Sequence, residues 1–234
     1  MRKILALLFA ITFFCLSIVG QSHAASNKWA IVIGNSAGVN SMGADNDARD
    51  MANVLKSKYG FASSNIMLLL NQKATKANVV SAISWLKGNI DASSSVVFFF
   101  SGHGSYGGDI APIDETDNRD EYIWLADQGV RDDELRTLLD IQPAKFLLWF
   151  QACYSGGMIP DLSGTNRVVI TSAKEDTVSV DYGRNSLFGY LFIDRAIKHG
   201  CGDANVDGVV SMEEASNYTN LGLMSDNYEG ELIP

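Results

Sequence analysis

Two residue types that together can carry out nucleophilic attack on a carbonyl carbon each follow an apolar run in this 234-residue sequence. His103 stands in Ser-Gly-His-Gly, directly after the run 95–100, and Cys153 stands in Gln-Ala-Cys-Tyr-Ser-Gly-Gly, directly after the run 146–150. A cysteine thiolate is a strong nucleophile, and a neighbouring histidine can transfer the proton that such a reaction needs. The pair therefore indicates nucleophilic catalysis, provided that the fold brings the two residues together.

The other histidines are weaker candidates for the base. His23 lies in the N-terminal leader, and His199 closes a predicted helix just before Gly200, where a positive charge is favourable. Cys153 has the alternative of being a buried structural thiol. However, the glycine-rich turns that follow both apolar runs have no packing rationale, which favours the catalytic interpretation.

The elements that must position these residues are apolar strands alternating with helical patterns. Continuous apolar runs are typical of a mainly parallel sheet with helices on both faces. Functional residues of such sheets stand at the carboxyl ends of the strands, so His103 and Cys153 are expected at one edge. The expected strands are 29–33, 66–70, 95–100, 146–150 and 168–171, and the expected helices include 48–59, one beginning after Thr75, 132–139 and 187–198.

On these motifs the sequence resembles the caspase-like cysteine peptidases, specifically the bacterial metacaspase-type branch. The residues that carry the resemblance are the SGHG and QACYSGG motifs, with His103 and Cys153 fifty positions apart. It covers roughly residues 28 to 200 and implies a caspase-like three-layer α/β sandwich. It also implies that Cys153 attacks the scissile carbonyl and that His103 protonates the leaving amine. The backbone N–H groups of Gly104 and Cys153 would form the oxyanion hole.

The resemblance also implies substrate-binding residues. Asp47 matches the metacaspase carboxylate that pairs with an Arg or Lys at the P1 position of the substrate. Gln151 stands where metacaspases have a second carboxylate and where caspases have a glutamine that helps to hold a P1 aspartate. No arginine occupies the matching caspase positions, so we expect cleavage after Arg or Lys. The alternative for Asp47 is a carboxylate stabilised by the first turn of a helix.

A calcium site is implied in the same way. The acidic loop 109–121 and the "DDEL" element at 132–135 resemble the region of metacaspases that binds an activating Ca²⁺. The alternative is helix capping, because the acidic residues 132–134 open a predicted helix. The positions carried over from the family are Asp127, Asp132, Asp133 and Asp161.

A second calcium site is predicted from the residues themselves. Residues 203–214 fit the twelve-residue EF-hand loop at every ligand position, with Gly208 at the sharp turn. A single loop favours a structural ion over a dockerin-like adhesive module, since such modules carry duplicated loops. The expected ligands are Asp203, Asn205, Asp207, the carbonyl of Val209, Ser211 and Glu214.

Residues 1–24 have the features of a signal peptide, with Arg2 and Lys3 before the apolar run 4–19 and small residues before Ala25. We therefore expect an exported protein with no membrane attachment after cleavage. Its catalytic domain would span 25–200 and a calcium-binding appendage 201–234. The net charge of −9 disfavours nucleic acid as a partner. The expected partner is a peptide or protein substrate, and the expected state is a monomer.

Two further possibilities remain open. Export places Cys153 and Cys201 in an oxidising compartment, where a disulfide between them would silence the nucleophile. The chain would then be a calcium-binding interaction protein on the same fold. Alternatively, the active enzyme would cut itself in the polar loop 172–186, at Lys174 or Arg184.

Overall fold

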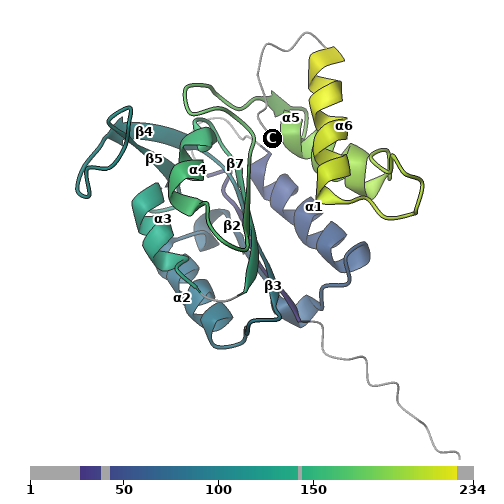
Figure 1. Ribbon diagram of the computed structural model, residues 1–234, viewed down its shortest axis with the longest axis horizontal. Helices are drawn as coiled ribbons and strands as arrows, with labels where there is room; N and C mark the ends of the chain where they lie inside the picture. The colour runs from purple at the N-terminus through teal and green to yellow at the C-terminus, as the bar shows by residue number, and fades with distance from the viewer. Residues whose placement is uncertain (1–26, 38–42, 142–143, 226–234) are drawn as a thin grey trace, which may run out of the picture.

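The computed structural model describes residues 27–37, 43–141 and 144–225. These residues form a central sheet in the order β2-β1-β3-β7-β8 (Figure 1), in which all neighbouring strands run parallel. The carboxyl ends of the strands therefore meet along one edge. The predicted signal peptide and residues 226–234 lie outside the described residues. The strands are β1 (Lys28–Gly34), β2 (Ile66–Leu70), β3 (Ser95–Ser101), β7 (Lys145–Gln151) and β8 (Arg167–Thr171).

Strand β1 shows why helices cover both faces of the sheet. Ile31 and Ile33 belong to one buried apolar cluster, whereas Ala30 and Val32 belong to another, because successive side chains of a strand point to opposite faces. The first face carries α2 (Lys76–Lys87), α3 (Asp132–Leu138) and α4 (Met158–Leu162). The second carries α1 (Ala44–Ser57), α5 (Leu187–Gly189) and the π-helix η4 (Tyr190–Lys198). This three-layer arrangement, visible in Figure 1, confirms the predicted fold class.

Aromatic side chains fasten the second helical layer to the sheet. Trp149 of β7 packs edge-on against Phe99 of β3, with ring centroids 5.3 Å apart, and against Phe192 of η4 at 4.4 Å. All three side chains are fully buried. Burying a large aromatic side chain contributes about 2–3 kcal/mol, so these contacts fix η4 against the sheet.

The remaining elements lie around the carboxyl edge of the sheet. A small antiparallel sheet, β4 (Gly104–Gly108), β5 (Arg119–Trp124) and β6 (Gly129–Arg131), begins directly after His103. A hairpin of β9 (Asp181–Tyr182) and β10 (Asn185–Ser186) precedes α5. The short 3-10 turns are η1 (Ser63–Asn65), η2 (Asn71–Lys73) and η3 (Ser155–Gly157).

The predicted calcium-binding appendage packs on the second face. Its helix α6 (Met212–Ser225) buries Ala215, and the loop before it buries Val210, in the same apolar cluster as Phe192 and Ile197. The described part of the appendage therefore shares the core of the domain. Within the described residues, no helix combines the length and the apolar character needed to cross a membrane.

Candidate active site

His103 and Cys153 follow neighbouring parallel strands. Ser101 of β3 pairs in register with Gln151 of β7, and the two functional residues each stand two positions further along the chain. The N–H of Gly102 donates to the carbonyl of Gln151 at 3.1 Å, so the two strand ends stay together beyond the sheet. Both His103 and Cys153 are partly exposed. The structure thus brings the predicted nucleophile and base to equivalent positions on one edge.

At Gly104 the backbones of these two strand ends come close together. The carbonyl of His103 accepts the N–H of Trp124 at 2.9 Å, which fixes the start of β4. A Cβ added at Gly104 would overlap the carbonyl oxygen of Cys153, so a side chain at this position is excluded. Only glycine fits here, because its lack of a side chain lets the backbone after the predicted base lie against the backbone at the predicted nucleophile.

The segment after β8 closes around the cysteine. The Sγ of Cys153 lies 3.9 Å from the carbonyl oxygen of Ser179, and the N–H of Tyr154 donates to the carbonyl of Thr177 at 2.8 Å. Gln151 is buried, and its Nε2 donates to the Ser179 Oγ at 2.7 Å. The structure therefore places this predicted substrate-binding residue beneath the loop, where it positions Ser179.

Asp47 lies in the first turn of α1 and is fully buried. Its carboxylate accepts hydrogen bonds from the Ser101 Oγ at 2.9 Å, the Ser186 Oγ at 2.7 Å and the Asn185 Nδ2 at 2.8 Å. Burial raises the pKa of Asp47 to about 6, although these hydrogen bonds lower it. Asp47 therefore ties the β9–β10 hairpin to the end of β3, two residues before His103.

A residue of the same hairpin, Asp181, acts on the electrostatics of both catalytic candidates. Burial raises the pKa of the Cys153 thiol, and the negative charge of Asp181 raises it further. Asp181 is an exposed residue, yet the partial burial of its carboxyl raises its pKa, an effect that the charge of His103 opposes. The hairpin thus adds a carboxylate to the electrostatic environment of both catalytic candidates, and nothing in the sequence motifs singled it out.

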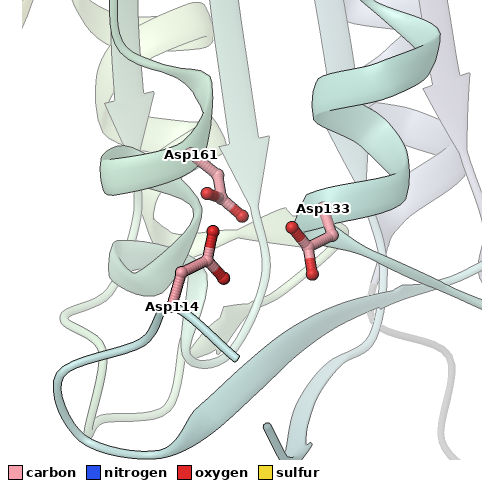
Figure 2. A group of neighbouring side chains, drawn as sticks. All are labelled: Asp114, Asp133 and Asp161. Atoms are coloured by element: carbon pink, nitrogen blue, oxygen red, sulfur yellow. The ribbon is translucent and has the colours of Figure 1, made fainter. Parts of the chain in front are cut away.

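Three of the four carboxylates carried over as calcium ligands come together. Figure 2 shows Asp133 and Asp161 converging with Asp114, a residue of the acidic loop that was not among the expected ligands. Asp132 and Asp161 also form a group with Glu115, with one oxygen of each residue within 4.8 Å of the others. The sequence marked this loop as acidic, but which of its residues meets α3 and α4 depends on how the loop folds.

Asp127, the fourth expected ligand, makes a different contact. Its Oδ1 accepts the backbone N–H of Lys76 at 2.9 Å, so it satisfies one of the free donors at the start of α2. In the group formed with Asp133 and Asp161, the third carboxylate is that of Asp114 and not that of Asp127. The carboxylate of Asp127 therefore has a capping role in the described structure.

We call the carboxylates of Asp114, Glu115, Asp120, Asp132, Asp133 and Asp161 the acidic cluster. Arginine side chains lie within it. Arg136 of α3 lies 3.1 Å from Asp161, 3.2 Å from Asp114 and 2.5 Å from Asp133, measured from guanidinium nitrogen to carboxylate oxygen. Arg131 lies 2.9 Å from Asp120. The cluster therefore already holds positive charge, supplied by the chain itself.

Even so, the cluster keeps oxygen atoms without partners. Among the described residues, the buried atoms Asp161 Oδ2, Asp120 Oδ1 and Glu121 Oε1 have no hydrogen-bond partner. Burial and neighbouring carboxylates raise the pKa of Glu121 to about 8, that of Glu115 to about 7 and that of Asp132 to about 6. Hard oxygen atoms that lack partners fit a Ca²⁺ ion, which takes six to eight such ligands.

The carboxylate of Glu121 also connects this cluster to the nucleophile. A Cβ added at Gly157 would overlap the Glu121 carboxylate, so that carboxylate lies directly against the turn four residues after Cys153. The backbone N–H of Glu121 donates to the Asp132 Oδ2 at 2.7 Å. Glu121 therefore bridges the expected metal ligands and the loop that carries the thiol, through its backbone N–H on one side and its carboxylate on the other.

The predicted EF-hand loop turns its oxygen atoms inward. The Glu214 carboxylate accepts the N–H groups of Asn205 at 3.2 Å and Ser211 at 2.9 Å, and Asp203 accepts that of Gly208 at 2.9 Å. Gly208 has φ of +84°, the left-handed conformation that the sharp turn requires. The side chains of positions 1 and 12 thus face the interior of the loop, as calcium coordination needs.

His199, the histidine judged a weaker candidate for the base, lies at the C-terminal end of η4. Its Nδ1 lies 2.7 Å from the carbonyl of Asp194 in the preceding turn, consistent with a capping role. Cys153 and the exposed Cys201 are both free thiols in the described structure. The predicted nucleophile, Cys153, is therefore not joined to Cys201 in the described residues.

Comparison with known proteins agrees with this architecture. The caspase domain family, peptidase family C14, matches residues 27–220, so the chain belongs to the caspase domain family of cysteine peptidases. Metacaspase-1 of Eremothecium gossypii is 28% identical over 186 residues, which are 71% of this chain and 40% of that protein. Metacaspase-1 of Meyerozyma guilliermondii is 26% identical over 209 residues, which are 81% of this chain and 48% of that protein. The chain thus spans less than half the length of these curated relatives.

Two solved structures share the fold at lower identity. Caspase-1 from Spodoptera frugiperda has a TM-score of 0.53 and 15% identity, covering 86% of this chain and 78% of that one. A protein from Geobacter sulfurreducens has a TM-score of 0.59 and 21% identity, covering 74% of this chain and 82% of that one.

Proposed function

We propose that this protein is an exported cysteine endopeptidase that binds Ca²⁺ and cleaves peptide or protein substrates after Arg or Lys, acting as a monomer. The observation that carries the proposal is the pairing of Ser101 with Gln151, which sets His103 and Cys153 at equivalent positions beyond two neighbouring strands. Gly104 adds a backbone approach that leaves no room for a side chain. Together these features supply a nucleophile, a proton carrier and backbone donors at one edge.

In the first half of the reaction, the Sγ of Cys153 attacks the scissile carbonyl carbon, and the thiol proton passes to His103. The carbonyl oxygen becomes an oxyanion, which the N–H groups of Gly104 and Cys153 stabilise. The C–N bond then breaks as His103 gives its proton to the leaving amine, and a thioester remains on Cys153.

In the second half, His103 takes a proton from water, and the resulting hydroxide attacks the thioester. The C–S bond breaks, the carboxylic acid leaves, and the thiol of Cys153 is regenerated with the proton from His103. Burial raises the pKa of the thiol, so the neutral thiol is favoured at rest and His103 must accept its proton during attack.

A basic P1 residue is supported by the charge at this edge. The carboxylates of Asp47 and Asp181 lie close to the strand ends, the first beneath the hairpin and the second on it. The charged group that acts on the electrostatics of both catalytic candidates is the carboxylate of Asp181. A negatively charged site favours a cationic substrate side chain and opposes an acidic one.

Two calcium ions are part of the proposal. Asp114, Asp132, Asp133 and Asp161 would hold one ion at the acidic cluster, and the residues at positions 1, 3, 5, 7, 9 and 12 of the 203–214 loop would hold the other. A bound ion neutralises carboxylates that otherwise repel one another. Through Glu121, which contacts both Asp132 and the turn at Gly157, the first site has a route to the nucleophile.

The test is hydrolysis of fluorogenic peptides with Arg, Lys or Asp at P1, with and without Ca²⁺, under reducing conditions. We expect cleavage after Arg or Lys that disappears in Cys153→Ala. Cleavage after Asp would keep the peptidase and overturn the specificity. A second function, a catalytically silent calcium-binding protein, would be favoured if no peptide were cleaved while thiol titration showed Cys153 to be free.

The exported state has its own test. Mass spectrometry of the secreted chain should give an N-terminus at Ala25, and a chain that retains residues 1–24 contradicts the proposed signal peptide. Sedimentation of the same material reports the oligomeric state, which we expect to be monomeric.

A further inference from the structure

The carboxylate of Asp47 is not accessible to a substrate side chain. It is fully buried, and both its oxygens accept hydrogen bonds, from Ser101, Asn185 and Ser186. A cationic side chain could reach it only after the hairpin had opened and these bonds had broken. Such displacement is unfavourable, because it would leave buried donors and a buried carboxylate without their partners. Asp47 is therefore placed to hold the hairpin in position.

Asp181 lies on β9, the strand of the hairpin opposite the residue that binds Asp47. It pairs in register with Ser186 across the β9–β10 hairpin, so the residue that binds Asp47 is also the direct neighbour of Asp181. Asp181 stands two residues after Ser179, whose carbonyl oxygen is 3.9 Å from the Cys153 thiol. The same hairpin is thus anchored at the nucleophile by Ser179 and at Asp47 by Ser186, with Asp181 between these two anchors.

The Asp181 carboxylate is also available. The residue is exposed, and among the described residues no hydrogen bond or ion pair engages its carboxylate. The charge of His103 lowers the pKa of Asp181, which burial raises, and the charge of Asp181 raises the pKa of Cys153. A carboxylate without a partner, fixed beside a nucleophile and open to solvent, fits a cation carried by the substrate.

We propose that Asp181 is the specificity-determining residue that pairs with the cationic side chain of the substrate, while Asp47 positions the hairpin that presents it. The inference rests on the proposed peptidase and names the carboxylate that would select Arg or Lys. It has a second consequence for the thiol. The charge of Asp181 disfavours the Cys153 thiolate until a substrate cation neutralises it, so the same pairing that selects the substrate favours activation of the nucleophile.

Binding can be measured apart from turnover. In the Cys153→Ala background, fluorescence anisotropy gives the dissociation constants of two matched peptides, one with Arg at P1 and one with citrulline, its neutral isostere. Asp181→Asn should weaken binding of the Arg peptide at least tenfold and leave the citrulline peptide unchanged. The matched control is Asp176→Asn, another exposed acidic residue of the same loop, which should leave both constants unchanged.

A second measurement reports the charge on the thiol. The pH dependence of Cys153 alkylation by iodoacetamide should show a lower thiol pKa in Asp181→Asn than in the wild-type chain, an effect that a purely structural defect would not produce. Equal Arg and citrulline affinities in the parent Cys153→Ala chain, or an unchanged affinity ratio in Asp181→Asn, would overturn the inference. So would a ratio lost in Asp47→Asn but kept in Asp181→Asn. An inactive wild-type enzyme would defeat the proposed function alone, because the binding measurement does not need catalysis.

Discussion

The guanidinium of Arg136 lies 3.1 Å from the carboxylate of Asp161, in the acidic cluster where a calcium ion is proposed. The same side chain contacts Asp114 and Asp133, two further residues of the cluster. Arg136 therefore acts as an internal counter-cation, and we expect a Ca²⁺ ion at the cluster to compete with it for these carboxylates.

Replacing this arginine should tighten calcium binding at the cluster. Partly exposed ion pairs contribute about 0.2–1 kcal/mol each, so the loss of three such competitors in Arg136→Gln corresponds to roughly a tenfold lower dissociation constant. Isothermal titration calorimetry measures it. Arg49→Gln, which breaks a surface pair with Asp45 on α1, is the control and should change nothing. An unchanged or weaker affinity in Arg136→Gln would show that Arg136 does not compete with the ion.

The contact between Gly104 and Cys153 predicts a sharp difference between two glycines of β4. In Gly104→Ala the added methyl group overlaps the Cys153 carbonyl oxygen, so the backbone must move away from the nucleophile. We expect kcat/KM to fall by at least a hundredfold, the size of effect seen when an oxyanion donor is lost. Gly108→Ala adds the same methyl group where nothing lies within 4 Å, and it should keep full activity.

Circular dichroism of both glycine variants separates a local effect from unfolding. A folded Gly104→Ala enzyme with normal activity would mean that the backbone at this position takes no part in catalysis. A Gly108→Ala enzyme that lost activity as well would mean that β4 is sensitive to substitution in general.

The sequence was informative wherever a single segment determines the structure. Continuous apolar runs predicted the parallel sheet, because strands buried on both faces leave no polar alternation. Because both residues directly follow such strands, the sequence also predicted that His103 and Cys153 stand at the same edge of the sheet. The Thr75 hydroxyl accepts the N–H of Asn78 at 3.3 Å, which confirms the predicted start of α2.

What the sequence missed depends on contacts between distant segments. The sequence predicts a polar loop over residues 172–186, because Asp181–Tyr182 and Asn185–Ser186 are too short to show alternation. Their pairing is visible only once Ser186 meets Asp47 across the fold. In the same way, Asp114 and Asp127 are both acidic residues in loops, and only the folded chain shows that the first meets Asp161 while the second caps α2.

The EF-hand loop gives a prediction about stoichiometry. With one ion at the acidic cluster and one in the loop, the wild-type chain should bind two Ca²⁺ ions. Glu214→Gln removes the carboxylate at position 12 and weakens its hold on the N–H groups of Asn205 and Ser211, so calorimetry should show one ion. Glu213→Gln, a change at the exposed neighbouring residue, should leave two. Two ions in Glu214→Gln would place the second site elsewhere.

The buried carboxyl of Asp47 should make stability depend on pH in a defined direction. Burial raises its pKa from 3.8 to about 6, so between these values the folded chain holds a proton that the unfolded chain has released. The stabilisation by this group is therefore complete below pH 3.8 and is lost as the pH rises through 6. A shift of this size corresponds to about 3 kcal/mol, because one pKa unit is about 1.4 kcal/mol.

Urea denaturation of the wild-type chain and of Asp47→Asn, from pH 4 to pH 7 in calcium-free buffer, isolates this contribution. Asparagine can keep the bonds from Asn185 and the backbone through its oxygen and donate to the serine hydroxyls through its nitrogen, so the variant should fold. The free energy of unfolding of the wild-type chain should fall relative to that of the variant as the pH rises. Asp45→Asn, a partly exposed carboxylate in the same helical turn, should run parallel to the wild type. Parallel curves for Asp47→Asn as well would mean that the Asp47 carboxyl titrates alike in the folded and unfolded chain.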